Sequence, residues 1–211
     1  SCTSAFAISP LFVSPELLVR DGLLKEGDLE FAPEFLSERV QYSSVLEFKI
    51  KLLTKCYDRF KESVGNNEFE KFCTQNSYWL DDFCLFTVLK NLFEGCSWNE
   101  WPEDIKKRNP DAIDRYVGNL QEPLEREKYF QFILYCQWME LKNYCQDKGL
   151  RIFGDVALYV NYDSADVWGH PNVFKLDQGL KPVVVAGVPP DYFSETGQKW
   201  GNPVFDWDYL H

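Results

Sequence analysis

The sequence predicts an α/β fold in which a mainly helical middle part leads into a buried strand and then a long loop. Apolar residues recur at helical spacing in three long segments between residues 44 and 147. After a short glycine turn, apolar residues then follow one another without alternation from Leu150 to Val160. A helix, a short turn and a strand buried on both faces are typical of a parallel α/β sheet or barrel.

The first elements are short. Ser14 and Pro15 have the residue types of an N-cap and a first helical turn, and this helix is predicted to end near Gly22. A linker rich in Gly, Asp, Glu and Pro follows to about Glu38, and an amphipathic helix is predicted over residues 44–63. The apolar positions that define that helix are Val45, Phe48, Leu52, Leu53 and Cys56.

Two longer helices and two short ones complete the helical part. The first long helix is predicted over residues 76–93, with Gly95 closing it. Short helices are predicted to start at Pro102 and at Asn109-Pro110. The second long helix is predicted over residues 123–147. Its apolar stripe consists of Phe130, Ile133, Leu134, Trp138, Leu141 and Cys145.

The composition is that of a soluble globular chain rich in aromatic residues. Its 211 residues suit one large domain or one and a half smaller ones, and they are 45% hydrophobic and 26% charged. Aromatic residues make up 17% of the chain, as 17 Phe, 11 Tyr and 7 Trp. They could form a heavily packed core or provide flat faces for a ligand such as a sugar, and composition alone leaves both readings open.

Charge and cysteine usage exclude several classes of partner. The net charge of −11 argues against binding to nucleic acid or to an anionic membrane, since both require a basic surface. The seven cysteines are scattered without a CxxC pair and there are only two histidines, so we expect no zinc site. Unpaired, scattered cysteines favour a reducing compartment.

The ends of the chain favour a processed protein or a segment of a longer one. The first ten residues lack both an initiator Met and the pattern of a signal peptide, and no stretch has the length of a transmembrane helix. At the other end, residues 206–211 begin an amphipathic pattern that stops.

Polar residues in and after the apolar run are the first candidates for a site. Asp155 lies within the predicted buried strand, where a carboxylate must be hydrogen-bonded or paired. It could cap loop amides at the strand end or contribute to ligand binding. We expect Asp163 and Asp166 to be loop and helix-start residues, and His170 to be a surface or capping histidine. Ser164 has no histidine at a suggestive distance and is not expected to act as a nucleophile.

The loop from Gly187 to Pro203 has a composition that suits a sugar ligand. Prolines and glycines stiffen and turn it, while three aromatic residues alternate with planar polar ones. Sugar C–H faces stack on aromatic rings and sugar hydroxyls need paired donors and acceptors. The other reading is a hydrophobic loop that packs onto the sheet. The residues that carry the ligand reading are Asp191, Tyr192, Phe193, Glu195, Gln198, Trp200 and Asn202.

Two segments closely resemble the amylomaltase family, which comprises the 4-α-glucanotransferases or disproportionating enzymes of glycoside hydrolase family 77. They are GDVALYVNYDSADVW, residues 154–168, and VAGVPPDYFSETGQKWGNP, residues 185–203. The resemblance covers nearly the whole chain, and four shorter matches lie outside these two segments. They are SAFA at 4–7, YWLDD at 78–82, WNEWP at 98–102 and QW at 137–138.

The resemblance implies part of a (β/α)8 barrel with a mainly helical inserted subdomain. On this basis residues 1–22 are a barrel segment after an early strand, and residues 23–122 are the helical insertion. Residues 123–160 are a barrel helix and strand, and residues 161–211 are a long active-site loop region leading to the next barrel helix. Because a complete barrel needs about 250 residues, the remainder of the barrel would have to come from elsewhere.

The resemblance also implies transfer of α-1,4-glucan chains by a retaining double displacement without metal or organic cofactor. It implies a location in the cytoplasm or in the plastid stroma of a plant or alga. The catalytic carboxylates of the family lie in motifs resembling Arg-Ile-Asp-His and Glu-Asp-Leu-Gly, and this chain contains neither. Only substrate-binding residues are therefore implied here. They are Asp155, at the end of a barrel strand, and Asp191, Tyr192, Phe193, Gln198, Trp200 and Asn202, in a lid-like loop. Two other outcomes remain open: a non-catalytic glucan-binding or regulatory remnant, and a segment that does not fold alone.

Overall fold

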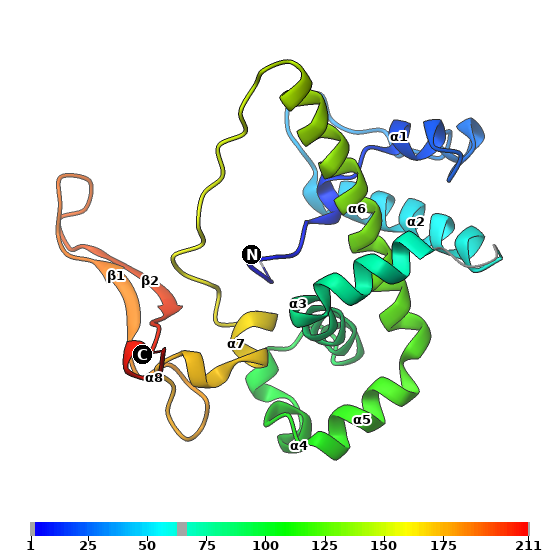
Figure 1. Ribbon diagram of the computed structural model, residues 1–211. Coiled ribbons are helices and arrows are strands. Elements are labelled where there is room, and N and C mark those ends of the chain that lie inside the picture. Colours follow the sequence, from blue (N-terminus) through cyan, green and yellow to red (C-terminus); the bar gives the residue numbers. More distant parts are fainter. Residues whose placement is uncertain (1–2, 63–66, 211) are drawn as a thin grey trace. The chain divides into compact units, whose positions relative to one another are not determined.

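The computed structural model describes residues 3–62 and 67–210 and divides the chain into two compact units (Figure 1). We call residues 8–77 and 125–154 the helical unit, and residues 1–7, 78–124 and 155–211 the mixed unit. Three predicted features fall in part outside the described residues: the end of the amphipathic helix at Ser63, the cysteine Cys2, and the terminal pattern at His211. The main helices are α1 (Pro15–Arg20), α2 (Tyr42–Lys61), α3 (Asn67–Leu92), α4 (Glu103–Lys106), α5 (Pro110–Asn119), α6 (Gln121–Asp147), α7 (Ala165–Gly169) and α8 (Trp207–Leu210). The strands are β1 (Val185–Val188) and β2 (Gln198–Pro203), and single 3-10 turns cover Pro10–Phe12, Glu26–Asp28, Trp98–Glu100 and Pro171–Val173.

Local capping signals confirm most of the predicted helix boundaries. The Ser14 hydroxyl accepts a hydrogen bond from the Leu17 amide at 3.2 Å, and Gly22 follows the helix with a φ of 73°. Asn109 caps α5 in the same way, through the Asp111 amide at 2.9 Å. Helix α3 begins nine residues earlier than predicted, and its additional first turns place Phe69 and Phe72 in the core.

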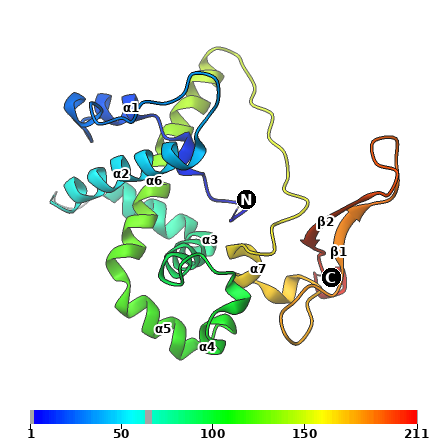
Figure 2. The ribbon, with the colours of Figure 1, turned by 180° about the vertical axis from the view of Figure 1, so that it is seen from behind.

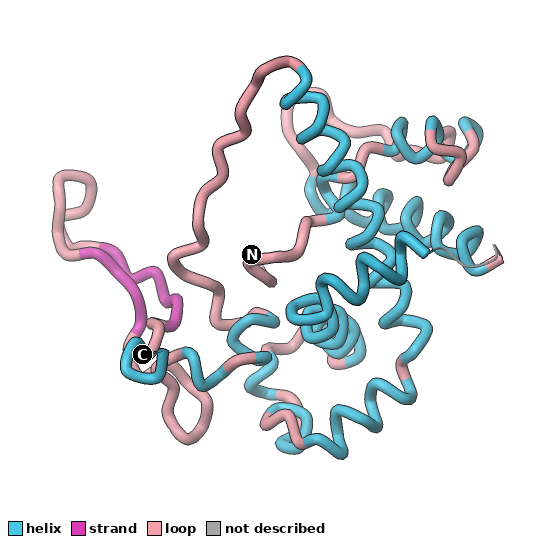
Figure 3. The backbone as a smooth tube through the Cα atoms, viewed as in Figure 1, coloured by secondary structure: helices cyan, strands magenta, loops and turns pink. Residues whose placement is uncertain are grey.

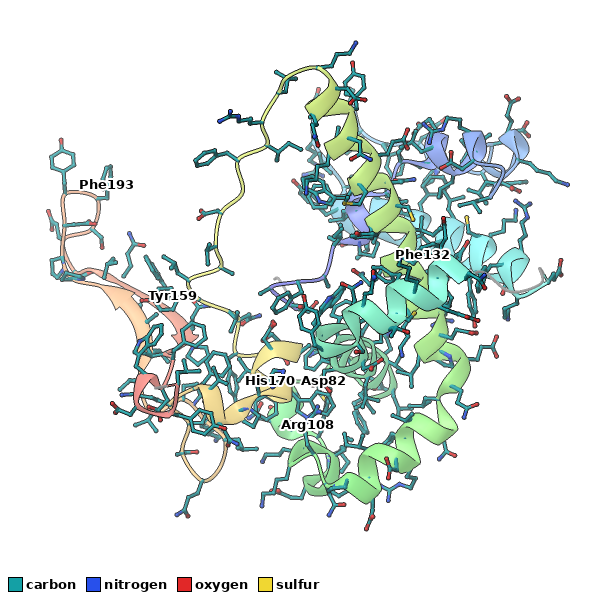
Figure 4. The ribbon with its side chains drawn as sticks, viewed as in Figure 1. Asp82, Arg108, Phe132, Tyr159, His170 and Phe193 are labelled. Carbon is teal, nitrogen blue, oxygen red and sulfur yellow. The ribbon has the colours of Figure 1, made fainter. Side chains whose placement is uncertain are left out.

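Aromatic packing holds the helical unit together. The rings of Tyr57, Phe60 and Tyr129 stack or tilt against one another, with centroids 4.5–6.4 Å apart. Phe69 and Phe132 extend the group (Figure 4), and the Tyr57 hydroxyl donates to Glu125 at 2.6 Å. Much of the aromatic content therefore serves the core.

The mixed unit has its own core around three tryptophans. Trp98 and Trp168 are fully buried, and the Trp101 and Trp168 rings meet edge to face at 5.5 Å. The Trp168 Nε1 group donates to the Ile105 carbonyl at 3.1 Å, and the Arg108 guanidinium lies 4.4 Å from the Trp168 ring centroid.

A polar cluster joins the end of α3 to the segment before α7. The Lys90 ammonium donates to the carbonyls of Gly95 and Cys96 and to the Asp163 carboxylate, at 2.6–2.9 Å. The other Asp163 oxygen accepts from the Trp98 amide at 3.2 Å. Asp163 is therefore a loop residue, as predicted.

The start of α7 also confirms its prediction. Asp166 lies in the first turn and accepts from the Ala5 amide at 3.0 Å, while the Ser164 hydroxyl caps the helix by accepting from the Val167 amide. His170 is an exposed residue at the end of the helix.

The predicted buried strand from Leu150 to Val160 is wrong for this structure. The segment is extended but unpaired and mostly exposed, and Figure 3 draws the chain between α6 and α7 without a strand. A strand needs neighbouring backbone to pair with and a surface to bury its side chains. The described residues provide the antiparallel pair β1–β2 and two isolated bridges, Phe174–Phe205 and Leu176–Pro182. The described part of the chain is therefore helical with little sheet and shows no closed barrel.

The predicted stripe of α6 is buried only in part. Phe130, Ile133 and Leu134 are in the core, whereas Trp138 and Leu141 are 41% and 50% exposed. The periodicity identified the helix correctly, but it could not show where along the helix its packing partners end.

Candidate functional site

The loop from Gly187 to Pro203 folds as a β-hairpin. Strands β1 and β2 pair antiparallel with Gly187 opposite Lys199 and Val188 opposite Gln198, and residues 189–197 form the tip (Figure 2). Gly197 has a φ of 74°, and a Cβ there would lie 2.5 Å from the Val188 carbonyl oxygen. Glycine is therefore required where the tip returns to β2.

Side-chain hydrogen bonds within the tip determine its shape. Asp191 Oδ1 accepts from the Phe193 and Ser194 amides at 2.9 and 2.8 Å, which is the pattern of an Asx turn. The Ser194 hydroxyl donates to the Gly197 carbonyl at 2.8 Å. Asp191, which was predicted to contact a ligand, thus has a clear role in ordering the backbone.

Two aromatic rings stand at the tip in solvent. Tyr192 is 98% exposed and Phe193 is 88% exposed, and their rings contact each other edge to face at 5.7 Å (Figure 4). A loop that merely packed onto the sheet would bury such rings. Their exposure favours the reading in which they are available to a ligand.

The three predicted residues of β2 are brought together on one side of the hairpin. The Trp200 Nε1 group donates to Gln198 Oε1 at 3.1 Å. Asn202 Nδ2 donates to the Val160 carbonyl at 2.8 Å, and the Trp200 ring meets the Tyr159 ring at 5.9 Å with an interplanar angle of 72°. Gln198, Trp200 and Asn202 therefore share the side that faces residues 159–160.

Asp155 lies in the same extended segment but makes only a local contact there. Its Oδ1 accepts from the Val156 amide at 2.8 Å, and the residue is exposed. The structure does not bring the carboxylate against the hairpin side chains. Its predicted binding role therefore remains a prediction.

Tyr159 is the residue that the sequence analysis missed. It lies in the apolar run that was interpreted as a doubly buried strand, so its ring was assigned to the core. It is instead 41% exposed and in contact with Trp200. The feature of the sequence that could have indicated its exposure is the polar hydroxyl, because a tyrosine commonly keeps one end in water.

A turn stabilised by tyrosine lies between α7 and the hairpin. The Tyr162 hydroxyl donates to the Leu180 carbonyl at 2.7 Å, where Leu180 adopts a φ of 62°. Burial, together with the nearby carboxylates of Asp177 and Asp163, raises the pKa of Tyr162 to about 12. The hydroxyl therefore keeps its proton, and this hydrogen bond, across the physiological pH range.

The side chains of the hairpin are of the kinds that suit a neutral polar ligand. Half-exposed and fully exposed rings alternate with amide and carboxylate groups, and residues 3–62 and 67–210 contain no group of three or more His, Cys, Asp or Glu arranged to hold a metal ion. In the same described part of the chain, no helix is both long and apolar enough to cross a membrane.

Comparison with known proteins identifies similar chains. A family model described as 4-alpha-glucanotransferase matches residues 1–211. The 4-alpha-glucanotransferase of Synechocystis sp. is 39% identical over 213 residues, covering 99% of this chain and 42% of the relative. That of Clostridium butyricum is 41% identical over 211 residues, covering 98% and 43%. The chloroplastic/amyloplastic 4-alpha-glucanotransferase of Solanum tuberosum is 40% identical over 202 residues, covering 93% and 34%.

A solved structure is similar over the same extent. The amylomaltase from Streptococcus agalactiae in complex with acarbose matches with a TM-score of 0.93 and 33% identity, covering 99% of this chain and 43% of that one. The chain thus spans about two fifths of the length of the proteins it matches.

Proposed function

Because this chain belongs to the 4-alpha-glucanotransferase family, we propose that it forms the substrate-binding part of an enzyme that transfers α-1,4-glucan chains between glucans or onto glucose. The single observation that supports a binding role best is the hairpin. It presents two solvent-exposed rings at its tip and a half-exposed tryptophan with polar neighbours at its base. Among the similar structures, the amylomaltase from Streptococcus agalactiae is complexed with acarbose.

The proposed binding residues fall into two groups on the hairpin. Stacking is assigned to the rings of Tyr192, Phe193 and Trp200, since a sugar C–H face fits an aromatic ring. Polar contacts are assigned to Asp191, Gln198 and Asn202, with Asp155 contributing from the extended segment. Asn202 and Asp191 each have a protein partner already, so a bound glucan would share or replace these hydrogen bonds.

For the fold, we propose that the complete protein is a (β/α)8 barrel with a mainly helical insertion. The domain boundaries predicted at residues 22, 122 and 160 belong to this proposal. Residues 150–160 would then pair in the barrel, which is consistent with their extended backbone and exposed apolar side chains. The similarity to chloroplastic/amyloplastic and bacterial proteins supports a location in the cytoplasm or the plastid stroma.

We expect the 211-residue chain alone to be unable to disproportionate maltotriose. A retaining double displacement needs a carboxylate nucleophile and a second carboxyl group that acts as acid and then base, about 5 Å apart. We assign both to parts of the enzyme outside this sequence. The purified chain should release no glucose or longer glucans from maltotriose, whereas the intact protein should. Turnover by the chain alone would contradict the assignment.

Replacing Trp200 by alanine in the intact protein should weaken glucan use. The loss of one stacked ring removes about 1–2 kcal/mol of binding free energy, which corresponds to an increase in KM of about 5- to 30-fold. Steady-state kinetics with a maltooligosaccharide series measures this effect, and Trp200→Phe, which keeps a ring, serves as the control. Unchanged kinetics in Trp200→Ala would exclude the Trp200 ring from substrate binding.

A further inference from the structure

We propose that Tyr159 is a positioning residue for glucan binding, which acts by holding the Trp200 ring in the orientation that stacks on a glucose unit. This inference rests on the proposed function, because it assumes that Trp200 binds the glucan. Tyr159 does not have to touch the substrate itself.

The geometry of the two rings is the first support. The Tyr159 and Trp200 centroids are 5.9 Å apart, and the rings are inclined at 72°. An edge-to-face pair is a favoured aromatic arrangement. It covers at most one face of the indole, and Trp200 remains 49% exposed. The tryptophan is thus restrained without being buried, as a stacking platform requires.

The surroundings of Trp200 are the second support. Its Nε1 group donates to Gln198 Oε1 at 3.1 Å. One position further along the extended segment, the Val160 carbonyl accepts from Asn202 Nδ2 at 2.8 Å. Residues 159 and 160 therefore contact β2 at two adjacent points, one apolar and one polar. The hydrogen bond keeps Tyr159, which Figure 4 labels, in reach of Trp200.

The physical consequence concerns the entropy of binding. A tryptophan ring that is already fixed loses little rotamer freedom when a sugar stacks on it, whereas a free ring must be ordered by the ligand. Removing the Tyr159 ring should therefore raise KM by about 2- to 10-fold, because ordering one large side chain has that effect on affinity. The kcat value should change little, since the reacting bond is not involved.

The experiment compares four variants of the intact protein: Tyr159→Phe, Tyr159→Ala, Trp200→Ala and the double variant Tyr159→Ala/Trp200→Ala. We expect Tyr159→Phe to match the wild type, because its ring keeps the edge-to-face contact. Tyr159→Ala should raise KM, and the double variant should be no worse than Trp200→Ala alone. Such non-additivity is expected of two residues that act through one contact.

A second readout separates positioning from general loss of structure. The 19F NMR spectrum of protein labelled with 5-fluorotryptophan gives a signal for Trp200, assigned by its absence in Trp200→Ala. This signal should shift in Tyr159→Ala and stay in place in Tyr159→Phe, while the other tryptophan signals remain unchanged. Signals that all move together would show that Tyr159 has only a structural role and would overturn the inference.

The outcomes distinguish the two levels of the proposal. If Trp200→Ala leaves KM unchanged, the proposed binding role of Trp200 is refuted, and this inference is refuted with it. If Trp200→Ala raises KM but Tyr159→Ala does not, the binding role of Trp200 is supported and the positioning role of Tyr159 is refuted. Additive effects in the double variant would also refute it, since Tyr159 would then act independently of Trp200.

Discussion

Replacing Trp168 by alanine is expected to lower the free energy of unfolding by about 3–5 kcal/mol, the usual effect of truncating a buried large aromatic residue. Trp168 is fully buried and packs against Phe86 and Trp101. Its loss also removes the donor for the Ile105 carbonyl and leaves the Arg108 guanidinium without the ring beneath it. Urea unfolding followed by circular dichroism measures the change.

Two further variants test whether the loss of stability comes from the buried ring of Trp168. Trp168→Phe keeps an aromatic ring but loses the Nε1 donor, so it should lower the free energy of unfolding by about 1–3 kcal/mol, less than the alanine variant. Trp200→Ala removes a half-exposed ring and should have a smaller effect on stability than Trp168→Ala. If all three variants unfolded at the same urea concentration, Trp168 would not be part of the core.

Replacing Gly187 by alanine is expected to disrupt the hairpin and reduce kcat/KM of the intact protein about 100-fold, because small displacements of a binding element have effects of this size. An added Cβ would lie 2.4 Å from the backbone carbonyl oxygen of Gln198. The clash is with the backbone of the paired strand, so no side-chain rotation relieves it. The strands must separate, and the rings at the tip and the base move with them.

The control for this variant is Gly118→Ala. Gly118 is an exposed residue of α5 with no heavy atom within 4 Å of an added Cβ and no positive φ, so alanine should be tolerated. Hydrogen exchange gives an independent measure, since amides of the β1–β2 ladder should lose protection in Gly187→Ala alone. A Gly187→Ala protein with normal protection and normal kcat/KM would show that the close approach of the strands is not needed.

The helices could be predicted from the sequence because their signals are local. Ser14, Asn109 and Ser164 each cap a helix through hydrogen bonds to amides two or three residues away. Such contacts depend on neighbouring residues alone and are therefore visible in one sequence. The predicted roles of Asp163 and Asp166 followed from the same kind of reasoning.

The strand and part of the site could not be predicted, because they depend on distant partners. Residues 150–160 have the composition of a buried strand, but pairing and burial require backbone that the described residues do not provide. The contact between Tyr159 and Trp200 joins positions far apart in the sequence, and no periodicity connects them. The resemblance to a family made residues 187–203 a candidate binding element, whereas their folding as a β-hairpin and their attachment to residues 159–160 required the structure.

The polar cluster around Lys90 has a consequence for the order of synthesis. A ribosome adds Lys90 and the two carbonyls that it binds almost together, but the Asp163 carboxylate comes 73 residues after Lys90. At about 5–20 residues per second, this delay is about 4–15 s. During that time the lysine has only its carbonyl partners, and the segment that leads into α7 and the hairpin cannot be fixed. We therefore expect the nascent chain to gain the proposed binding hairpin late, since Trp168 of the core and both hairpin strands also follow Asp163 in the sequence.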